Sequence, residues 1–220
     1  MSKIAMRVID VLTLVAIPIA MYFAFIYAPV EARMGVVQKI FYFHVASAWV
    51  GFFALFVTFI ASIVFLARGS RISDDVANAS AEIGFVFCLI VLLTGPIWAK
   101  PTWGVWWTWD VRLTTTLVLV FIYAAYLLLR KFIYEPERRG KFCAVVGIIG
   151  FVDVPLVFFS IRWWGTIHPN VVQKGGGGLH PDMLTALIVS VLAFTLLYVS
   201  LMNKRVRLAT LERANYEDDK

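Results

Sequence analysis

Residues 45–67 read VASAWVGFFALFVTFIASIVFLA, a run without one charged side chain. An apolar run of about 18 or more residues predicts a transmembrane helix, because about 20 helical residues span the hydrocarbon core of a bilayer. The composition agrees: 61% of the 220 residues are hydrophobic and 15% are charged, whereas soluble domains average about 25% charged residues. The sequence therefore predicts an integral membrane protein and excludes an ordinary soluble enzyme or DNA-binding domain.

Five further runs resemble this one in length and composition. The six predicted spans are 8–28, 45–67, 77–98, 113–129, 142–161 and 183–202. The apolar run of the first span is longer than the roughly 7–15 residues of a signal-peptide core, so we interpret it as a retained helix. Six spans leave little other sequence, so we expect an all-α polytopic membrane protein with one domain covering residues 1–220.

The basic residues predict the orientation, because short cytoplasmic segments retain Lys and Arg. With both termini inside, 14 of the 20 Lys and Arg residues lie on the inner side. The other six are Arg33, Lys39, Lys100, Arg112, Arg162 and Lys174. We therefore expect an N-in/C-in topology. This distribution of Lys and Arg explains the net charge of +6, so the charge does not indicate a nucleic-acid partner.

The tryptophans gather on the predicted outer side. Seven of the eight lie in or beside outer loops, and all three histidines do the same. These residues are Trp98, Trp103, Trp106, Trp107, Trp109, Trp163, Trp164, His44, His168 and His180. An aromatic belt is the alternative explanation, but a belt populates both membrane faces. Tyr occurs on both sides here and Trp does not, which favours a specific role for the Trp cluster.

The Trp-rich segment 99–112 has a helical pattern. Trp103, Trp106, Trp107 and Asp110 follow the i, i+3, i+4, i+7 spacing of one helix face. Pro101 would suit the first turn. We therefore expect a short interfacial helix on the outer face, with a flat aromatic surface suited to a planar ligand.

A planar ligand with a metal would explain why histidines accompany the tryptophans, since haem iron accepts axial imidazole. Three outer cations, Lys100, Arg112 and Arg162, could meet acidic groups on the edge of such a ligand or, equally, lipid phosphates. From the residues alone, haem and a set of structural histidines beside an aromatic belt both stay open.

Three stretches resemble a known family. Residues 94–114, TGPIWAKPTWGVWWTWDVRLT, are similar to the WWD signature of haem-handling membrane proteins of cytochrome c maturation. The segments KIFYFHV, ending at Val45, and FFSIRWWGTIH, ending at His168, resemble the His-bearing segments of the CcmC family, heme exporter protein C. The resemblance extends over nearly the whole chain.

The resemblance implies a haem carrier in the bacterial inner membrane with its site on the periplasmic side. It implies transient, bis-His haem b with His44 and His168 as axial ligands. Trp103, Trp106, Trp107 and Trp109 would form the platform with Asp110, and Lys100, Arg112 and Arg162 would meet the propionates. The implied partners are a CcmE-like periplasmic haem chaperone and an ABC-transporter-like complex of CcmA, CcmB and CcmD. The protein would be a carrier and not an enzyme, beyond any promotion of covalent haem attachment to the chaperone.

Three features are not explained by this pattern. We interpret His180 as a residue ahead of the helix that begins near Pro181. The alternatives are a further ligand and a neighbour of the site that binds nothing. Asp153, in the fifth span, is expected to form a hydrogen-bonded kink with Pro155. Glycines 175–178 would ease movement of the His168 segment.

Three alternative functions stay open. They are a permease or channel subunit for another substrate, an electron-transfer cytochrome subunit and a purely structural transporter subunit. An electron-transfer cytochrome would carry its histidines in the middle of the membrane.

Overall fold

The structure, a computed structural model, describes residues 3–164, 168 and 179–218. Within these ranges it forms helices and no β-strand, and six helical segments are long and apolar enough to cross a membrane. The helices are α1 (Lys3–Tyr22), η1 (Phe23–Tyr27), η2 (Val36–Lys39), α2 (Ile40–Arg68), α3 (Arg71–Trp103), α4 (Val111–Phe132), α5 (Pro136–Phe151), α6 (Asp153–Trp163) and α7 (Pro181–Asp218). The predicted all-α, six-span fold is confirmed.

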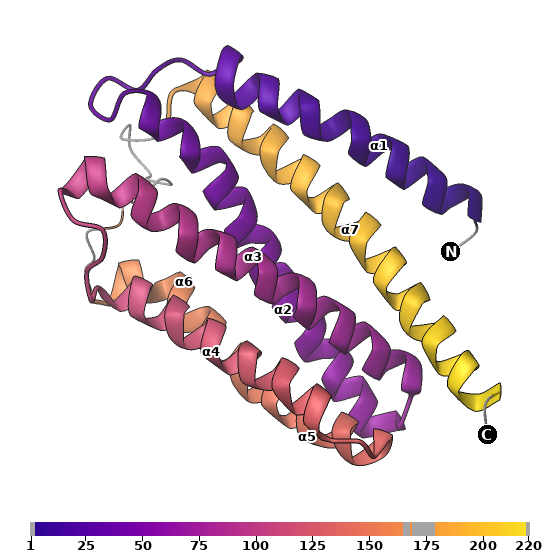
Figure 1. Ribbon diagram of the computed structural model, residues 1–220. Coiled ribbons are helices and arrows are strands. Elements are labelled where there is room, and N and C mark those ends of the chain that lie inside the picture. The colour runs from indigo at the N-terminus through magenta and orange to yellow at the C-terminus, as the bar shows by residue number, and fades with distance from the viewer. Residues whose placement is uncertain (1–2, 165–167, 169–178, 219–220) are drawn as a thin grey trace.

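The bundle has two distinct ends (Figure 1). Both chain termini lie at one of them, here called the terminal end, with the α2–α3 and α4–α5 connections. The opposite end, called the Trp-rich end, carries residues 28–39, the α3–α4 connection and the end of α6. The common side of the termini follows from an even number of spans. The N-in/C-in orientation itself stays a prediction.

The helices α2 and α3 form the centre of the bundle, with α7 and α1 on one side and α4, α5 and α6 on the other (Figure 1). Small residues allow the central pair to approach closely. A Cβ atom at Gly84 of α3 would lie 2.8 Å from the Leu55 side chain and 3.1 Å from that of Ala54 in α2. Such small-residue contacts are the common way in which membrane helices pack, because lipid provides no hydrophobic drive for association.

The Trp-rich segment differs from its prediction. The expected interfacial helix does not form: α3 continues through Pro101 to Trp103, and residues 104–110 are not helical. Gly104 ends α3 with a φ of 78°, and its N–H donates to the Lys100 carbonyl 2.9 Å away. Glycine adopts this left-handed cap without steric cost. The chain therefore leaves the helical path at Gly104, where the predicted helix would have continued.

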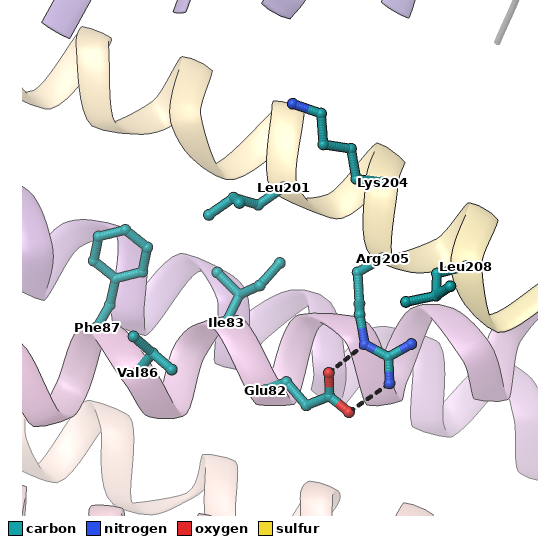
Figure 2. A pocket seen from close by; sticks show the side chains of 8 residues that line it. All are labelled: Glu82, Ile83, Val86, Phe87, Leu201, Lys204, Arg205 and Leu208. Atoms are coloured by element: carbon teal, nitrogen blue, oxygen red, sulfur yellow. Dashed lines mark hydrogen bonds and ion pairs between the residues drawn. The ribbon is translucent and has the colours of Figure 1, made fainter.

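Polar residues on α3 tie the terminal end together. The guanidinium of Arg130 on α4 donates to the Asp74 carboxylate at 2.9 Å. On α7, Arg205 pairs with Glu82 at 2.9 Å (Figure 2), and Arg213 pairs with Asp75 at 2.6 Å. The N-terminal half of α3 therefore holds α4 and α7 by charge-assisted bonds, which are the stronger class of hydrogen bond.

Lys39 has a structural role. The sequence pattern counts it as an outer cation, yet it is only 6% exposed. Its ammonium group donates to the Phe25 carbonyl at 2.8 Å and the Ala28 carbonyl at 2.9 Å, at the end of η1. These are carbonyls of a helix C-terminus, which lack helical partners and favour a cation.

We therefore expect Lys39→Met to destabilise the protein by about 1.5–3 kcal/mol, the usual contribution of hydrogen bonds to a charged group. Methionine keeps the length of the side chain and removes the donor. Unfolding of the detergent-solubilised protein measures the change. Lys3→Met, at an exposed position of α1, is the control and should change little; equal effects of the two variants would contradict the capping role.

The fifth span is interrupted where the sequence predicts a kink. Val152 separates α5 from α6, and Asp153 begins α6 ahead of Pro155. Asp153 is 9% exposed, and its Oδ2 atom has no hydrogen-bond partner within the described residues. The break is confirmed, while the expected hydrogen bond is not seen at this oxygen.

Candidate functional site

A small cavity at the Trp-rich end brings together residues from distant parts of the sequence. Its walls come from α2, α3, α4 and α6, together with Trp107 and His168, which lie outside the helices. Five of the lining side chains can coordinate a metal, donate a hydrogen bond or stack on a planar ring. They are His44, Trp103, Trp107, Arg112 and His168. The two histidines that the family resemblance pairs, 124 positions apart in the sequence, therefore face one cavity.

His44 lies in the first turns of α2 and is oriented by a neighbouring helix. Its Nδ1 atom is 2.9 Å from the hydroxyl oxygen of Thr94 on α3. Gly95 lies beside the ring, since a Cβ atom there would be in ordinary van der Waals contact with Cε1 of the imidazole, at 3.6 Å. The ring is thus held at one nitrogen, and His44 is among the residues that line the cavity.

His168 packs among aromatic rings. Its imidazole lies 5.6 Å from the Trp103 ring and 6.3 Å from the Trp98 ring, measured between centroids. Burial, and then the Arg112 guanidinium and His44, lower the pKa of His168 to about 3. The imidazole is therefore neutral at physiological pH, and a neutral imidazole is the form that ligates metals.

The tryptophans divide into two groups. Trp103 and Trp107 line the cavity, and the Nε1 atom of Trp107 is buried without a hydrogen-bond partner within the described residues. Trp106 is 58% exposed and Trp109 is 76% exposed, and neither lines the cavity. The irregular course of residues 104–110 explains the division, because only a helix would have placed Trp106 beside Trp103 and Trp107.

The polar residues predicted for the site also separate. Arg112 lines the cavity at the start of α4. Asp110 is the N-cap of α4 and accepts from the Arg112 backbone N–H at 3.0 Å. Lys100 donates to the Gly104 carbonyl at 2.8 Å, and Arg162 is exposed on α6; neither lines the cavity.

His180 lies elsewhere. It is exposed beside the start of α7, where its Nδ1 accepts from the Asp182 backbone N–H at 3.3 Å and lies 3.5 Å from the Asp182 carboxylate. It does not line the cavity. Its position agrees with a residue that precedes a helix. Lys174 and glycines 175–178 fall outside the described residues.

A larger cavity lies far from these groups. It occupies about 380 Å³ between α3 and α7 and is lined by aliphatic side chains, Phe87 and the Glu82–Arg205 pair (Figure 2). It contains neither histidine nor tryptophan. The larger cavity therefore has the greater volume, but the smaller cavity has the side chains that can bind a ligand and is the candidate site.

The donor set of the smaller cavity restricts the ligand. Among the described residues, no group of three or more His, Cys, Asp or Glu side chains could hold a bare metal ion. Two imidazoles at one cavity are the protein ligands that iron accepts when a macrocycle supplies the others. Aromatic walls, the Trp107 N–H and the Arg112 cation fit a flat molecule with acidic substituents.

The comparisons with known proteins agree with this chemistry. A family model described as "Heme exporter protein C" matches residues 1–219. The chain belongs to the heme exporter protein C family. It is 37% identical over 188 residues to the heme exporter protein C of Bradyrhizobium diazoefficiens. The aligned region covers 84% of this chain and 72% of that relative.

Other relatives in this family come from bacteria and a plant. The heme exporter protein C of Escherichia coli is 32% identical over 197 residues, which is 89% of this chain and 79% of the relative. A ccmC-like mitochondrial protein of Marchantia polymorpha, named for cytochrome c biosynthesis, is 32% identical over 176 residues, or 80% of this chain and 75% of the relative. The match therefore extends across the membrane-spanning bundle.

Proposed function

We propose that this protein carries haem for cytochrome c maturation and binds it at the Trp-rich end. His44 and His168 are the axial ligands of the iron, and Trp103 and Trp107 face the macrocycle. The observation that carries the proposal is the convergence of the two imidazoles on one cavity together with Trp107 and Arg112. Membership of the heme exporter protein C family supports haem as the cargo.

The haem is b-type and held transiently. Two imidazoles complete the coordination of the iron and leave no open position for oxygen chemistry, which suits a carrier and not a catalyst. Arg112 binds a propionate through charge-assisted hydrogen bonds. We place this site on the periplasmic face of the bacterial inner membrane, in accordance with the N-in/C-in prediction.

Binding requires the cavity to widen. Its volume of about 50 Å³ is far below the ~300–1,000 Å³ of typical ligand pockets. Trp107 lines the cavity from a segment outside the helices, so its movement widens the cavity at the least cost. Haem enters and leaves past Trp107, and dissociation of the His168–iron bond begins the transfer to a CcmE-like periplasmic chaperone. CcmA, CcmB and CcmD are the proposed complex partners.

A haem titration tests the function. Purified protein in detergent is titrated with ferric haem and followed by its visible spectrum. We expect one haem per chain with the bands of low-spin, bis-imidazole iron. A spectrum equal to that of haem in detergent alone would contradict the proposal and favour a permease for another substrate.

Arg112→Ala tests the propionate contact. Because a hydrogen bond to a charged group contributes about 1.5–3 kcal/mol, we expect haem affinity to fall about 10–100-fold. Haem dimethyl ester, which lacks the carboxylates, should bind the unchanged protein and Arg112→Ala with similar affinity. Arg33→Ala, at an exposed residue of the same end, is the control.

The same titration compares the other predicted cations. Arg162→Ala and Lys100→Ala should alter haem affinity less than Arg112→Ala does, because neither side chain lines the cavity. A loss in Arg162→Ala that equals the loss in Arg112→Ala would contradict this assignment of the propionate site.

A further inference from the structure

The contacts of the Thr94 hydroxyl together define its role. Thr94 Oγ1 lies 2.7 Å from the Ile90 carbonyl oxygen, one turn earlier in α3, 3.4 Å from the Val91 carbonyl oxygen and 2.9 Å from His44 Nδ1. A carbonyl oxygen can only accept, and a hydroxyl has a single hydrogen to donate. Thr94 therefore donates to Ile90 and accepts from His44.

This direction fixes the tautomer of the imidazole. With its hydrogen on Nδ1 and donated to Thr94, the neutral His44 ring presents a lone pair on Nε2. Within the described residues no hydrogen bond reaches Nε2, and the side chain forms part of the cavity wall. The nitrogen available to a metal is thus Nε2.

We infer that Thr94 is a positioning residue that orients His44 and sets Nε2 as its iron-binding atom, an inference that rests on the proposed haem function. Metal-ligating histidines commonly donate their second N–H to an oxygen acceptor, which fixes ring orientation and raises the basicity of the ligand. Here the acceptor comes from α3 and the ligand from α2, so the two central helices together determine the geometry of the axial bond.

Two substitutions separate the hydroxyl from the volume of the side chain. Thr94→Val has nearly the same shape and no acceptor, whereas Thr94→Ser keeps the hydroxyl. We expect Thr94→Val to weaken haem binding about 10–100-fold, the usual effect of removing the hydrogen-bond partner of a metal ligand. Thr94→Ser should bind haem almost as the unchanged protein does.

Two further measurements respond to the ligand itself. A less basic imidazole stabilises ferric iron less, so the reduction potential of bound haem should rise in Thr94→Val and return in Thr94→Ser. In haem-free protein labelled with ¹⁵N-histidine, NMR should show His44 as the Nδ1–H tautomer, and Thr94→Val should lose that preference. The His44 signals are assigned by their absence in His44→Ala.

Thr115→Val is the matched control. The Thr115 hydroxyl donates to the Val111 carbonyl at 2.7 Å, the same bond to the preceding turn that Thr94 makes, but Thr115 does not line the cavity. Its substitution should leave affinity, potential and the His44 tautomer unchanged. An equal effect of Thr115→Val would overturn the inference, as would an unchanged potential in Thr94→Val or a failure of Thr94→Ser to restore binding.

Failure of the haem function itself gives a different result. If the protein shows no bis-imidazole spectrum, or if His44→Ala retains that spectrum, the ligand assignment is wrong whatever Thr94 does. If His44→Ala loses the spectrum and Thr94→Val behaves as the unchanged protein, only the role of Thr94 is wrong.

Discussion

The variants His44→Ala and His168→Ala are each expected to lose the low-spin, bis-imidazole spectrum of bound haem. One imidazole remains in each variant, so the iron becomes high-spin or takes up an external ligand. We expect haem affinity to fall by more than about 100-fold, since even removal of a hydrogen-bond partner behind a metal ligand costs about 10–100-fold. Visible spectra and electron paramagnetic resonance of the titrated proteins measure both effects.

His180→Ala provides the matched control for these two variants. His180 is also a histidine of the Trp-rich end, but it contacts Asp182 and not the cavity. Its substitution should leave the spectrum and the affinity unchanged. Exogenous imidazole should restore low-spin bands in His44→Ala if the loss is one of coordination. Bis-imidazole bands that persist in either axial variant, or that vanish only in His180→Ala, would be incompatible with the proposed ligands.

The largest loss of stability is expected for Asp74→Ala. This substitution leaves the Arg130 guanidinium without the carboxylate that it contacts, and both side chains are mostly buried, at 15% and 11% exposed. Breaking a buried pair by removing one partner typically costs about 3–5 kcal/mol, because the remaining charge loses its compensation. Unfolding of the detergent-solubilised protein should report this loss.

An exposed pair gives the comparison for Asp74→Ala. Glu137 and Lys141 lie 2.6 Å apart on α5, with side chains 71% and 62% exposed. Water already solvates both charges, so Glu137→Ala should hardly change stability. Similar losses in the two variants would mean that burial of the Asp74–Arg130 pair does not decide its contribution. Haem titration of Asp74→Ala should still show bis-imidazole iron, because the pair lies at the terminal end.

Composition and periodicity were sufficient for the architecture. A charge-free run such as residues 45–67 has one stable arrangement in a bilayer, where every backbone polar group must be satisfied within the segment. The clustering of Trp and His on one predicted side agrees with the structure, in which His44, Trp103, Trp107 and His168 line one cavity. The apolar runs and the Trp and His cluster each involve many residues. A single residue that departs from either pattern therefore does not change the prediction.

Local geometry was less predictable. The spacing of Trp103, Trp106 and Trp107 indicates a helix face only if the helix continues, and the left-handed Gly104 ends it. Lys39 has the same sequence signature as a solvated loop cation, yet folding places it against carbonyls of η1. In each case the outcome depends on a single backbone or tertiary contact that leaves no periodic pattern.

Thr94 illustrates what sequence patterns cannot show. Threonine hydroxyls in helices commonly donate to the carbonyl of the preceding turn. Thr94 makes this bond, and so do Thr115 and Thr195. Only the tertiary position of His44 converts that ordinary hydroxyl into an acceptor for the imidazole. The resemblance of residues 94–114 to a known signature includes Thr94, but it carries no information about the direction of this hydrogen bond.

The packing of α1 has a consequence for the order of synthesis. Among the described residues α1 packs chiefly against α7, and its Asp10 carboxylate accepts from Ser200 and lies 2.9 Å from the Lys204 ammonium. Because α7 follows α1 by the length of the bundle, α1 acquires its principal partner only after α2 to α6 have been made. The contacts of Asp10 with Ser200 and Lys204 therefore form only after the segments that carry His44 and His168 have been made.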